Sequence, residues 1–301
     1  MAISRTIYSQ SQVKLTTGDF GVAQTDFAVI SGVQNASVTF NTPRQNVNSF
    51  GVRGIIDKVQ VEAETATATL SFILPQVTGA GNHLSPVKLN QLMQNSLLDT
   101  PTGINVSVAG LGCVYSGVLA SVTINAAVGD LPTCELTFEG IPSGGSAAQD
   151  YDGELPDKIT AVSASTYYVL TPDKVSGVVN TQNIVEGGNG NPASNNIGNF
   201  GASAQSASFS WEIPVERVLS LGASVNDAAV FTTLPGTSSL TAEGLDMPSG
   251  IDGLIVGGYT ISVTNAKQVS REHSLAVGEV GATYNVTMES TADSCTITTT
   301  A

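Results

Sequence analysis

The sequence predicts a mainly β protein with two tandem antiparallel β-barrel or β-sandwich domains, one of them with a flanking α-helix. Three observations lead to this expectation: a block of sequence that occurs twice, many segments in which apolar and polar residues alternate, and one segment with helical spacing. A chain of 301 residues is long enough for two domains of about 150 residues each.

The repeated block covers residues 33–51 and 204–222, which are separated by a constant 171 residues. Seven of the 19 aligned pairs are identical, and most of the others keep their physical type. Further along, residues 133–140 match residues 283–290 at an offset of 150, with three identities in eight. Two matches in the same order predict one fold used twice, as in chains that build symmetric or quasi-symmetric assemblies.

The two copies share a repeat-core motif of aromatic, aliphatic, Pro and Gly residues. In each copy two apolar residues spaced i,i+3 precede a Gly, a pattern that predicts a short helical turn after a strand. The motif residues are Phe40, Pro43, Val47, Phe50, Gly51, Trp211, Pro214, Val218, Leu221 and Gly222.

Alternating segments predict half-buried antiparallel strands along both halves of the chain. The alternation at residues 59–63 changes phase near Glu64, which indicates a bulge or a tight turn before the next strand. The other alternating segments are residues 66–74, 121–126, 134–139, 208–213, 259–264 and 284–289.

One helix is predicted at about residues 86–98. Ser85 suits the N-cap and Pro86 the first helical position. The apolar residues that fall on one face are Leu89, Leu92, Met93 and Leu97. The second half has no equal segment, so we expect that it lost this helix.

These elements divide the chain into a first domain at residues 1–145 and a second at 158–301. A Gly/Ser-rich and then acidic linker, residues 146–157, separates them. Residues 181–203 form a Gly/Asn-rich loop with no counterpart in the first half.

Composition argues against several classes of function. Only 12% of residues are charged and the net charge is −14, which disfavours nucleic-acid binding but suits a wall that repels DNA. We expect no catalytic site, no metal site and no cofactor, because no catalytic or metal-ligand spacing is present. The three cysteines are expected to be small buried hydrophobes. Without a signal peptide or an apolar run of membrane-span length, we expect a cytoplasmic protein without membrane contact.

The first copy resembles the major tail tube proteins of long-tailed bacteriophages. The similar residues are the strand and Pro-Arg-x-x-Val-x-x-Phe-Gly run at residues 37–51, the Ile-Asp-x-Val type run at 55–61, and a strand with Val-Gly-Asp-x-Pro-Thr at 119–133. The second copy departs from the pattern, because Val215 stands where Arg44 does and the helix is missing. The resemblance implies tail-tube-like barrel or sandwich modules, six of which form a ring.

If six modules make a ring, three chains of two modules suffice, so we expect trimeric, pseudo-sixfold rings that stack into the phage tail tube. DNA would pass through this tube during infection as cargo that does not stick. The expected partners are copies of the chain itself and other tail proteins (tape measure, terminator, distal tail). The expected location is the virion tail, with host cytoplasm during assembly.

Acids on the polar faces of predicted strands are candidates for the lumen of such a tube. They are Glu62, Glu64, Glu135, Glu139, Glu212 and Glu289. For any one of them, a position on the outer, solvated surface is an equal alternative.

Two other classes of function remain open. The chain could be a capsid decoration or minor tail protein, which would stay a small oligomer. It could also be a secreted tandem β-sandwich binding module, although aromatic residues make up only 6% of the chain.

Overall fold

The structure is a computed structural model of the chain, and it describes part of the sequence. The described residues are 13–17, 25–48, 50, 53–60, 62, 64–75, 84–99, 101–108, 112–142, 175–178, 204–218, 229–232, 235–244, 253–256, 259–274 and 283–299. The expected linker 146–157 and loop 181–203 lie outside these residues. Within them the fold is mainly β with one α-helix, as the sequence predicts.

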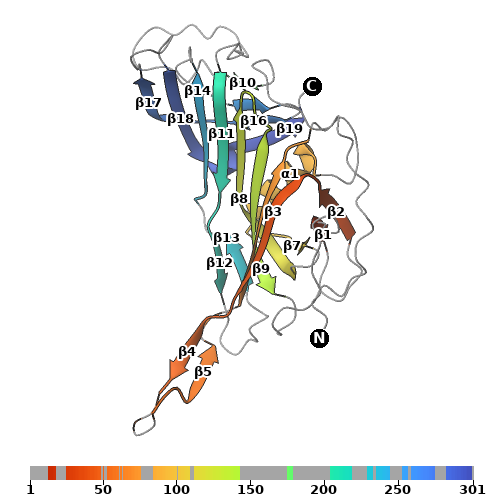
Figure 1. The fold of residues 1–301 in the computed structure, drawn as a ribbon, viewed down its shortest axis with the longest axis vertical. Helices are drawn as coiled ribbons and strands as arrows, with labels where there is room; N and C mark the ends of the chain where they lie inside the picture. Colours follow the sequence, from red (N-terminus) through yellow and green to blue (C-terminus); the bar gives the residue numbers. More distant parts are fainter. Residues whose placement is uncertain are drawn as a thin grey trace.

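Eight strands, each paired with the next, form a continuous antiparallel sheet that runs through both halves of the chain (Figure 1). We call these eight strands the ladder. In spatial order they are β3 (Val33–Asn41), β6 (Thr65–Ile73), β9 (Thr133–Pro142), β8 (Gly112–Ala127), β11 (Ala204–Glu212), β14 (Thr237–Gly244), β18 (Thr283–Thr291) and β17 (Lys267–Ser274). The first four belong to the first half of the sequence and the last four to the second. The two halves meet where β8 pairs with β11.

The sheet branches at β8, because two strands pair with different parts of the same edge. Its last part pairs with β11, whereas its first part pairs with β7 (Ile104–Val108). Two more strands, β1 (Val13–Thr17) and β2 (Thr25–Ile30), extend this branch. The strand bends at Ser116, which has a φ of 45°. At the next residue, Gly117, a Cβ atom would lie 2.9 Å from the carbonyl oxygen of Ile104, so the tight branch point requires glycine.

A second layer lies behind the ladder. It contains a four-stranded sheet in the order β10 (Val175–Val178), β15 (Gly253–Val256), β16 (Tyr259–Val263) and β19 (Cys295–Thr299). In Figure 1 the strands of this sheet cross behind the upper strands of the ladder. The helix α1 (Pro86–Ser96) lies on the same side and contacts both β8 and β19.

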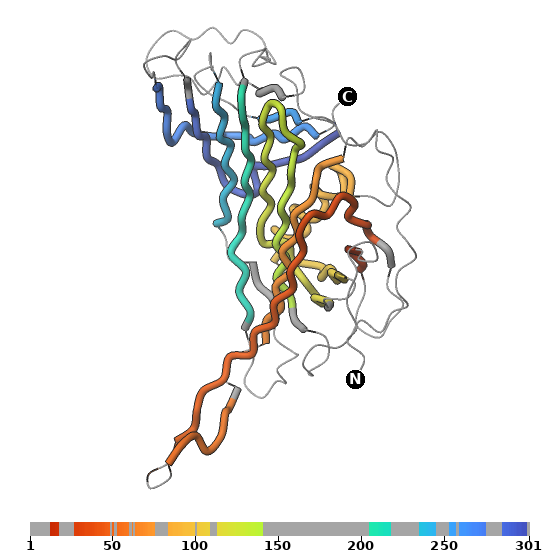
Figure 2. Tube along the Cα trace, viewed as in Figure 1, coloured from red at the N-terminus to blue at the C-terminus, as the bar shows by residue number. Residues whose placement is uncertain are grey.

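Two hairpins continue from the ladder strands, one in each copy of the repeat. They are β4 (Arg44–Val47) with β5 (Asp57–Gln60), and β12 (Val215–Val218) with β13 (Ala229–Thr232). Figure 2 shows the β4–β5 hairpin projecting away from the body of the molecule. The helical turns expected after β3 and β11 are therefore wrong. The apolar residues spaced i,i+3 do not begin a helical turn, because the chain continues in extended conformation after Pro43 and Pro214.

The two halves repeat the same strand pairing, residue by residue. Ser37 lies opposite Thr69 in the first half, and their counterparts Ser208 and Thr241 lie opposite each other in the second. Ser121 lies opposite Thr137, and the equivalent pair is Ser270 with Thr287.

Irregularities in the ladder are repeated as well. The register shifts at Gln34 in β3 and at Gln205 in β11, two identical residues in the aligned block. It shifts again at Ala120 in β8 and at Val269 in β17. Bulges are specific features of a fold, so their recurrence supports a common architecture for the two halves.

The predicted helix is confirmed with its cap. The Ser85 hydroxyl accepts a hydrogen bond from the backbone N–H of Lys88 at 3.3 Å, and Pro86 occupies the first turn. Leu89, Leu92 and Met93 are buried on the face that meets the sheets. The helix also binds the C-terminal strand, because the Asn90 side chain accepts from the N–H of Ile297 at 2.9 Å.

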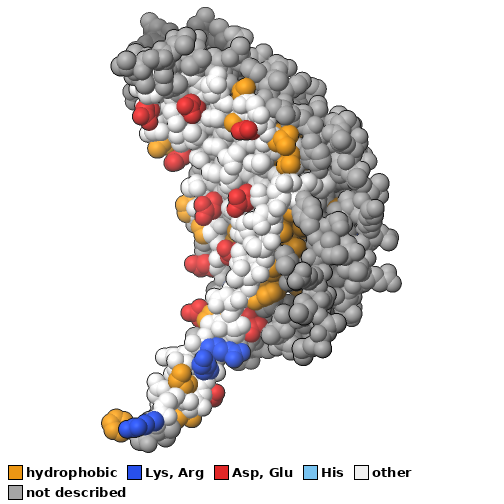
Figure 3. Space-filling view, viewed as in Figure 1, with side chains coloured by type: hydrophobic (Ala, Val, Ile, Leu, Met, Phe, Trp, Pro, Cys, Tyr) orange, Lys and Arg blue, Asp and Glu red, His pale blue; other side chains and the backbone are white. Residues whose placement is uncertain are grey.

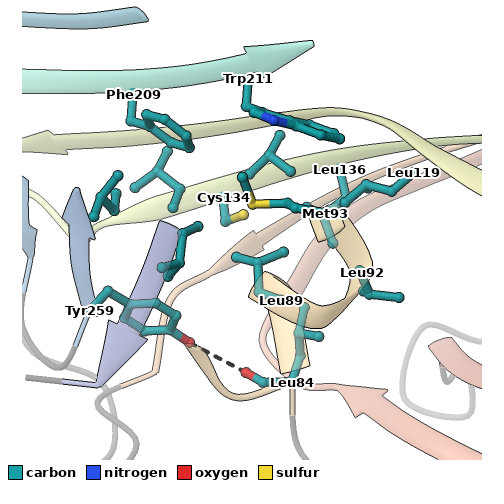
Figure 4. Close-up of a cluster of buried hydrophobic side chains, with 14 of the residues drawn as sticks. Leu84, Leu89, Leu92, Met93, Leu119, Cys134, Leu136, Phe209, Trp211 and Tyr259 are labelled. Atoms are coloured by element: carbon teal, nitrogen blue, oxygen red, sulfur yellow. Dashed lines mark hydrogen bonds between the residues drawn. The ribbon is translucent and has the colours of Figure 1, made fainter. Parts of the chain in front are cut away.

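One hydrophobic core runs between the two layers (Figure 4). Phe209 and Trp211 of β11 point from the ladder toward Met93 and Leu89 of α1. Tyr259 of β16 donates its hydroxyl to the carbonyl oxygen of Leu84 at 3.3 Å. Residues from both halves of the sequence thus share this core, and the expected domain boundaries remain a prediction.

Candidate functional site

The polar face of the eight-stranded ladder is the candidate functional surface. Residues directly opposite each other on neighbouring strands point to the same face of a sheet. Following the pairs from Thr69 to Thr137, Ser121, Glu212 and Thr237 crosses five strands on one face. The neighbouring residues on these strands, such as Leu136, point to the other face and are buried in the core.

Carboxylates are spaced across this face among Ser, Thr and Asn side chains. The strand pairs place six acids and one lysine on it: Glu135, Glu139, Glu212, Glu243, Glu272, Glu289 and Lys267. Figure 3 shows acidic side chains in red from the upper end of the molecule down to the root of the hairpin, where blue basic side chains begin. Such a face repels the phosphates of a nucleic acid.

Four of the six predicted lumen acids therefore share one face: Glu135, Glu139, Glu212 and Glu289. The other two lie elsewhere, because β5 ends at Gln60 and β6 begins at Thr65. Glu62 is exposed in this connection, and Glu64 accepts a hydrogen bond from the Thr42 hydroxyl at 3.1 Å. The expected strand across residues 59–63 is thus shorter than its alternation suggested.

Two members of the acidic face, Glu243 and Glu272, were not predicted from the sequence. Glu243 lies on β14 next to Ser206, whose hydroxyl donates to its Oε2 at 3.5 Å. The signal that could have identified them is the alternation of apolar and polar residues along their strands. This alternation is weak on β17, where all eight residues are exposed.

Hydroxyl groups on the face bind one another across strands. The hydroxyls of Ser210 and Ser239 are 2.8 Å apart, and those of Thr241 and Thr287 are 3.2 Å apart. These bonds engage side-chain hydroxyls that could otherwise donate to phosphate oxygens.

Glu139, one of the acids on this face, is half-buried near Arg217 of β12. Burial raises the pKa of Glu139, and the nearby Arg217 of β12 opposes this by lowering it. Burial in turn lowers the pKa of Arg217, whereas Glu139 raises it. Among the described residues, the three buried guanidinium nitrogens of Arg217 have no hydrogen-bond partner, so Glu139 is the charge that compensates them.

A hollow of about 640 Å³ lies on the polar face beside the turn between β8 and β9. Its lining includes Asn125, Asp130, Thr241, Glu243 and Asn285. Gly129, with a φ of 93°, forms the turn at its rim. The turn lies in the Val-Gly-Asp-x-Pro-Thr run and joins β8 to β9 in an antiparallel hairpin.

The repeat-core motif is divided between the core and the surface. Trp211 is fully buried and Phe40 is partly buried against the core. Phe50 is 107% exposed and Val47 is 40% exposed, so a core role for these two is wrong. Both belong to the β4–β5 hairpin, which carries them away from the body.

The other residues of the repeat-core motif are either at least partly exposed or outside the described residues. Pro214 is exposed and Pro43 is of intermediate exposure, in agreement with their places between strands. Gly51, Leu221 and Gly222 lie outside the described residues, as does the side chain of Val218.

The β4–β5 hairpin, residues 44–60, combines exposed apolar and basic side chains. The large apolar side chains exposed there are Val47, Phe50, Ile55, Ile56 and Val59. Three basic residues, Arg44, Arg53 and Lys58, are exposed on the same hairpin. The hairpin therefore places these apolar side chains in solvent rather than in the core.

The cysteines are buried, as expected from the sequence. Cys113, Cys134 and Cys295 are all free thiols inside the fold. Burial raises the pKa of Cys295 to about 12 and raises that of Cys134 further, so these thiols stay protonated. Neither is activated as a nucleophile.

In the described part of the chain, no three or more His, Cys, Asp or Glu side chains are grouped to hold a metal ion. His273 is exposed on β17, and His83 lies outside the described residues. No helix within the described ranges has the length and apolarity that crossing a membrane requires.

Comparison of the chain with known protein families and with curated proteins finds no match.

Proposed function

We propose that this chain is a structural virion protein that forms stacked trimeric rings and thereby the tail tube of a bacteriophage. The observation that carries the proposal is the continuous eight-stranded ladder with one acidic face. Both halves of the chain contribute four strands to it in the same register. One chain therefore supplies two equivalent arcs of a ring.

Geometry supports a pore of suitable width. Three chains of eight strands supply 3 × 8 = 24 strands. With strands about 4.8 Å apart and a tilt of up to about 40°, a closed barrel of this size is roughly 35 to 50 Å across at the backbone. Side chains narrow this opening, but it still admits a duplex about 20 Å wide.

Charge supports the direction in which the ladder faces. Three chains carry 3 × −14 = −42 charges, and six acids of each chain lie on the polar face. A lumen of this sign keeps DNA in solution rather than bound to the wall. The core layer and α1 lie on the opposite side and would form the outer wall.

Electron microscopy of the purified protein tests the proposal. We expect hollow tubes or stacked rings, and class averages with three chains in each ring. A ring of six chains would overturn the trimer. A protein that stays a small oligomer under all assembly conditions would instead favour a decoration or minor tail protein.

A further inference from the structure

We propose that β17 of one chain pairs with β3 of a second copy, in the register that β8 and β11 have within the chain. This inference rests on the proposed ring and specifies the contact that closes it. The chain contains one example of the junction between its two halves. A ring needs the same junction again between chains.

Each of the two strands needed for this junction has one strand partner among the described residues. Within the part of the chain that the structure describes, β3 pairs only with β6, and β17 pairs only with β18. They are the two ends of the eight-stranded ladder and lie far apart across it in Figure 1. A strand that has a neighbouring strand on one edge can pair on its other edge with a strand of another molecule.

Internal registers identify which strands are equivalent. β11 is the second copy of β3, because Ser208 pairs with Thr241 as Ser37 pairs with Thr69. β17 is the second copy of the last part of β8. Ser274 pairs with Thr283 as Asn125 pairs with Thr133, with a register shift at the same place before it.

If β17 and β3 pair between chains as β8 and β11 pair within one chain, the residues that lie opposite each other are fixed. Within the chain, Phe209 lies opposite Ile124 and Trp211 lies opposite Val122. The corresponding pairs between chains are Ser37 with Ser274, Val38 with His273, Thr39 with Glu272, Phe40 with Arg271, and Asn41 with Ser270.

Burial differs between the two copies in the direction that this pairing predicts. Phe209 and Trp211, which lie on a strand flanked on both sides, are fully buried. Their counterparts Val38 and Phe40 are only partly buried, and every residue of β17 is exposed. A neighbouring strand would cover the open side of Phe40 as β8 covers Trp211.

The side chains that would meet are compatible in this register. Thr39 and Glu272 both belong to the polar face, whereas Phe40 and Arg271 both belong to the opposite face. Arg271 replaces the apolar Val122 of the internal junction, and a guanidinium can stack on the ring of Phe40. A slip of one residue would exchange the two faces, so the register is well specified.

Charge at the adjoining hairpin agrees with the same placement. Within the chain, Arg217 of the β12–β13 hairpin lies near Glu139. The counterpart of Glu139 is Glu289, and Lys58 lies directly opposite the counterpart of Arg217, which is Asn46. The transferred junction thus brings an exposed lysine of one chain toward Glu289 of the next.

Disulfide trapping tests this register. Chains with Ser37→Cys and Ser274→Cys are assembled, oxidised and separated under denaturing, non-reducing conditions. We expect covalent dimers and trimers. A second pair, Val38→Cys with His273→Cys, samples the alternate type of strand pair, so one of the two has the closer Cβ spacing.

The matched control pairs Ser37→Cys with Ser270→Cys. Both positions lie on the same face, but the shift of four residues separates them by about 13 Å, so we expect at least roughly tenfold less crosslinking. Equal crosslinking of the control would overturn the register. Crosslinking of Ser37→Cys alone would show β3 pairing with itself and would overturn it too.

The outcome separates this inference from the proposed function. Closed rings without crosslinks at either matched pair would overturn the register but leave the tube proposal standing. Matched crosslinks in open oligomers that never close would support the register and count against the tube. A protein that forms neither would overturn both.

Discussion

The indole nitrogen of Trp211 donates a hydrogen bond to the carbonyl oxygen of Ala292 at 3.0 Å. This bond joins β11, in the middle of the ladder, to the short 3-10 helix Ala292–Ser294 that precedes the last strand. Both residues are buried, at 0% and 1% exposure. A single side chain therefore connects the acidic sheet to the layer behind it.

Two substitutions of Trp211 should destabilise the fold to different extents. Trp211→Phe keeps an aromatic ring but leaves the buried carbonyl without this donor, which should cost about 1–3 kcal/mol. Trp211→Ala also opens a cavity and should cost about 3–5 kcal/mol. Chemical denaturation followed by circular dichroism measures both. The control Phe40→Ala, at the equivalent but partly buried position, should cost less than Trp211→Ala.

A second buried contact joins α1 to the ladder. The hydroxyl of Ser96 donates to the carbonyl of Leu92 at 2.9 Å and accepts from the N–H of Leu119 at 3.1 Å. Leu119 lies beside the register shift of β8. The helix thus satisfies a strand N–H at an irregular point of the sheet.

Ser96→Ala should therefore destabilise the fold by about 1–3 kcal/mol, because the buried N–H of Leu119 loses its acceptor. The measurement is the free energy of unfolding. Ser210→Ala, which removes an exposed hydroxyl on the polar face, is the control and should change stability by less than about 0.5 kcal/mol. Equal effects of the two substitutions would contradict this role for Ser96.

The sequence predicted local elements well wherever a periodic pattern faced the core. The cap at Ser85, the helix behind it and the alternating strands around Trp211 are examples. The assumption that an apolar residue at a regular spacing faces the core was wrong at Phe50, which is exposed on a hairpin. Periodicity cannot distinguish an apolar residue that packs in the chain from one that projects outward for contact with another molecule.

Pairing between distant strands was out of reach of local patterns. That β8 pairs with β11, joining the halves into one sheet, follows from no local residue spacing. Equally, Arg217 and Glu139 are 78 positions apart, and their proximity depends on this junction. The acidic face was predicted in part because alternation identifies which acids avoid the core, but it does not identify which strands lie side by side in the sheet.

The raised pKa of Glu139 predicts a change of stability with pH. Burial favours its protonated form in the folded state, so its contribution to stability is present below the ordinary value of 4.5 and is lost as pH rises through the folded pKa. The melting temperature of Glu139→Gln should therefore fall less than that of the native chain between pH 4 and neutral pH.

Two further variants check this assignment. Glu135→Gln, on the same strand and face, keeps Glu139 and should retain the native fall. Arg217→Met removes the charge that lowers the pKa of Glu139, so the fall should extend to higher pH. An unchanged pH profile in both Glu139→Gln and Arg217→Met would contradict the coupling of the two residues.

Charge reversal on the acidic face should turn a repelling wall into a binding one. The double variant Glu135→Lys, Glu212→Lys changes each chain by four charges on the polar face, and each ring of three by twelve. Neither side chain lies in the core, so tubes should still form. Because lysines release counterions from DNA phosphates, these tubes should bind a short duplex, with an affinity that falls steeply between about 50 and 200 mM salt.

The control variant, Glu216→Lys with Asp293→Lys, makes the same change of charge at two exposed positions outside the ladder. Co-sedimentation of tubes with labelled DNA measures the difference, and blocked tube ends should reduce binding only in the first variant. A lumen requires both results, because DNA reaches an internal wall through the ends alone. If the control tubes bind DNA equally and end-blocking has no effect on either variant, the acidic face lies on the outside of the particle.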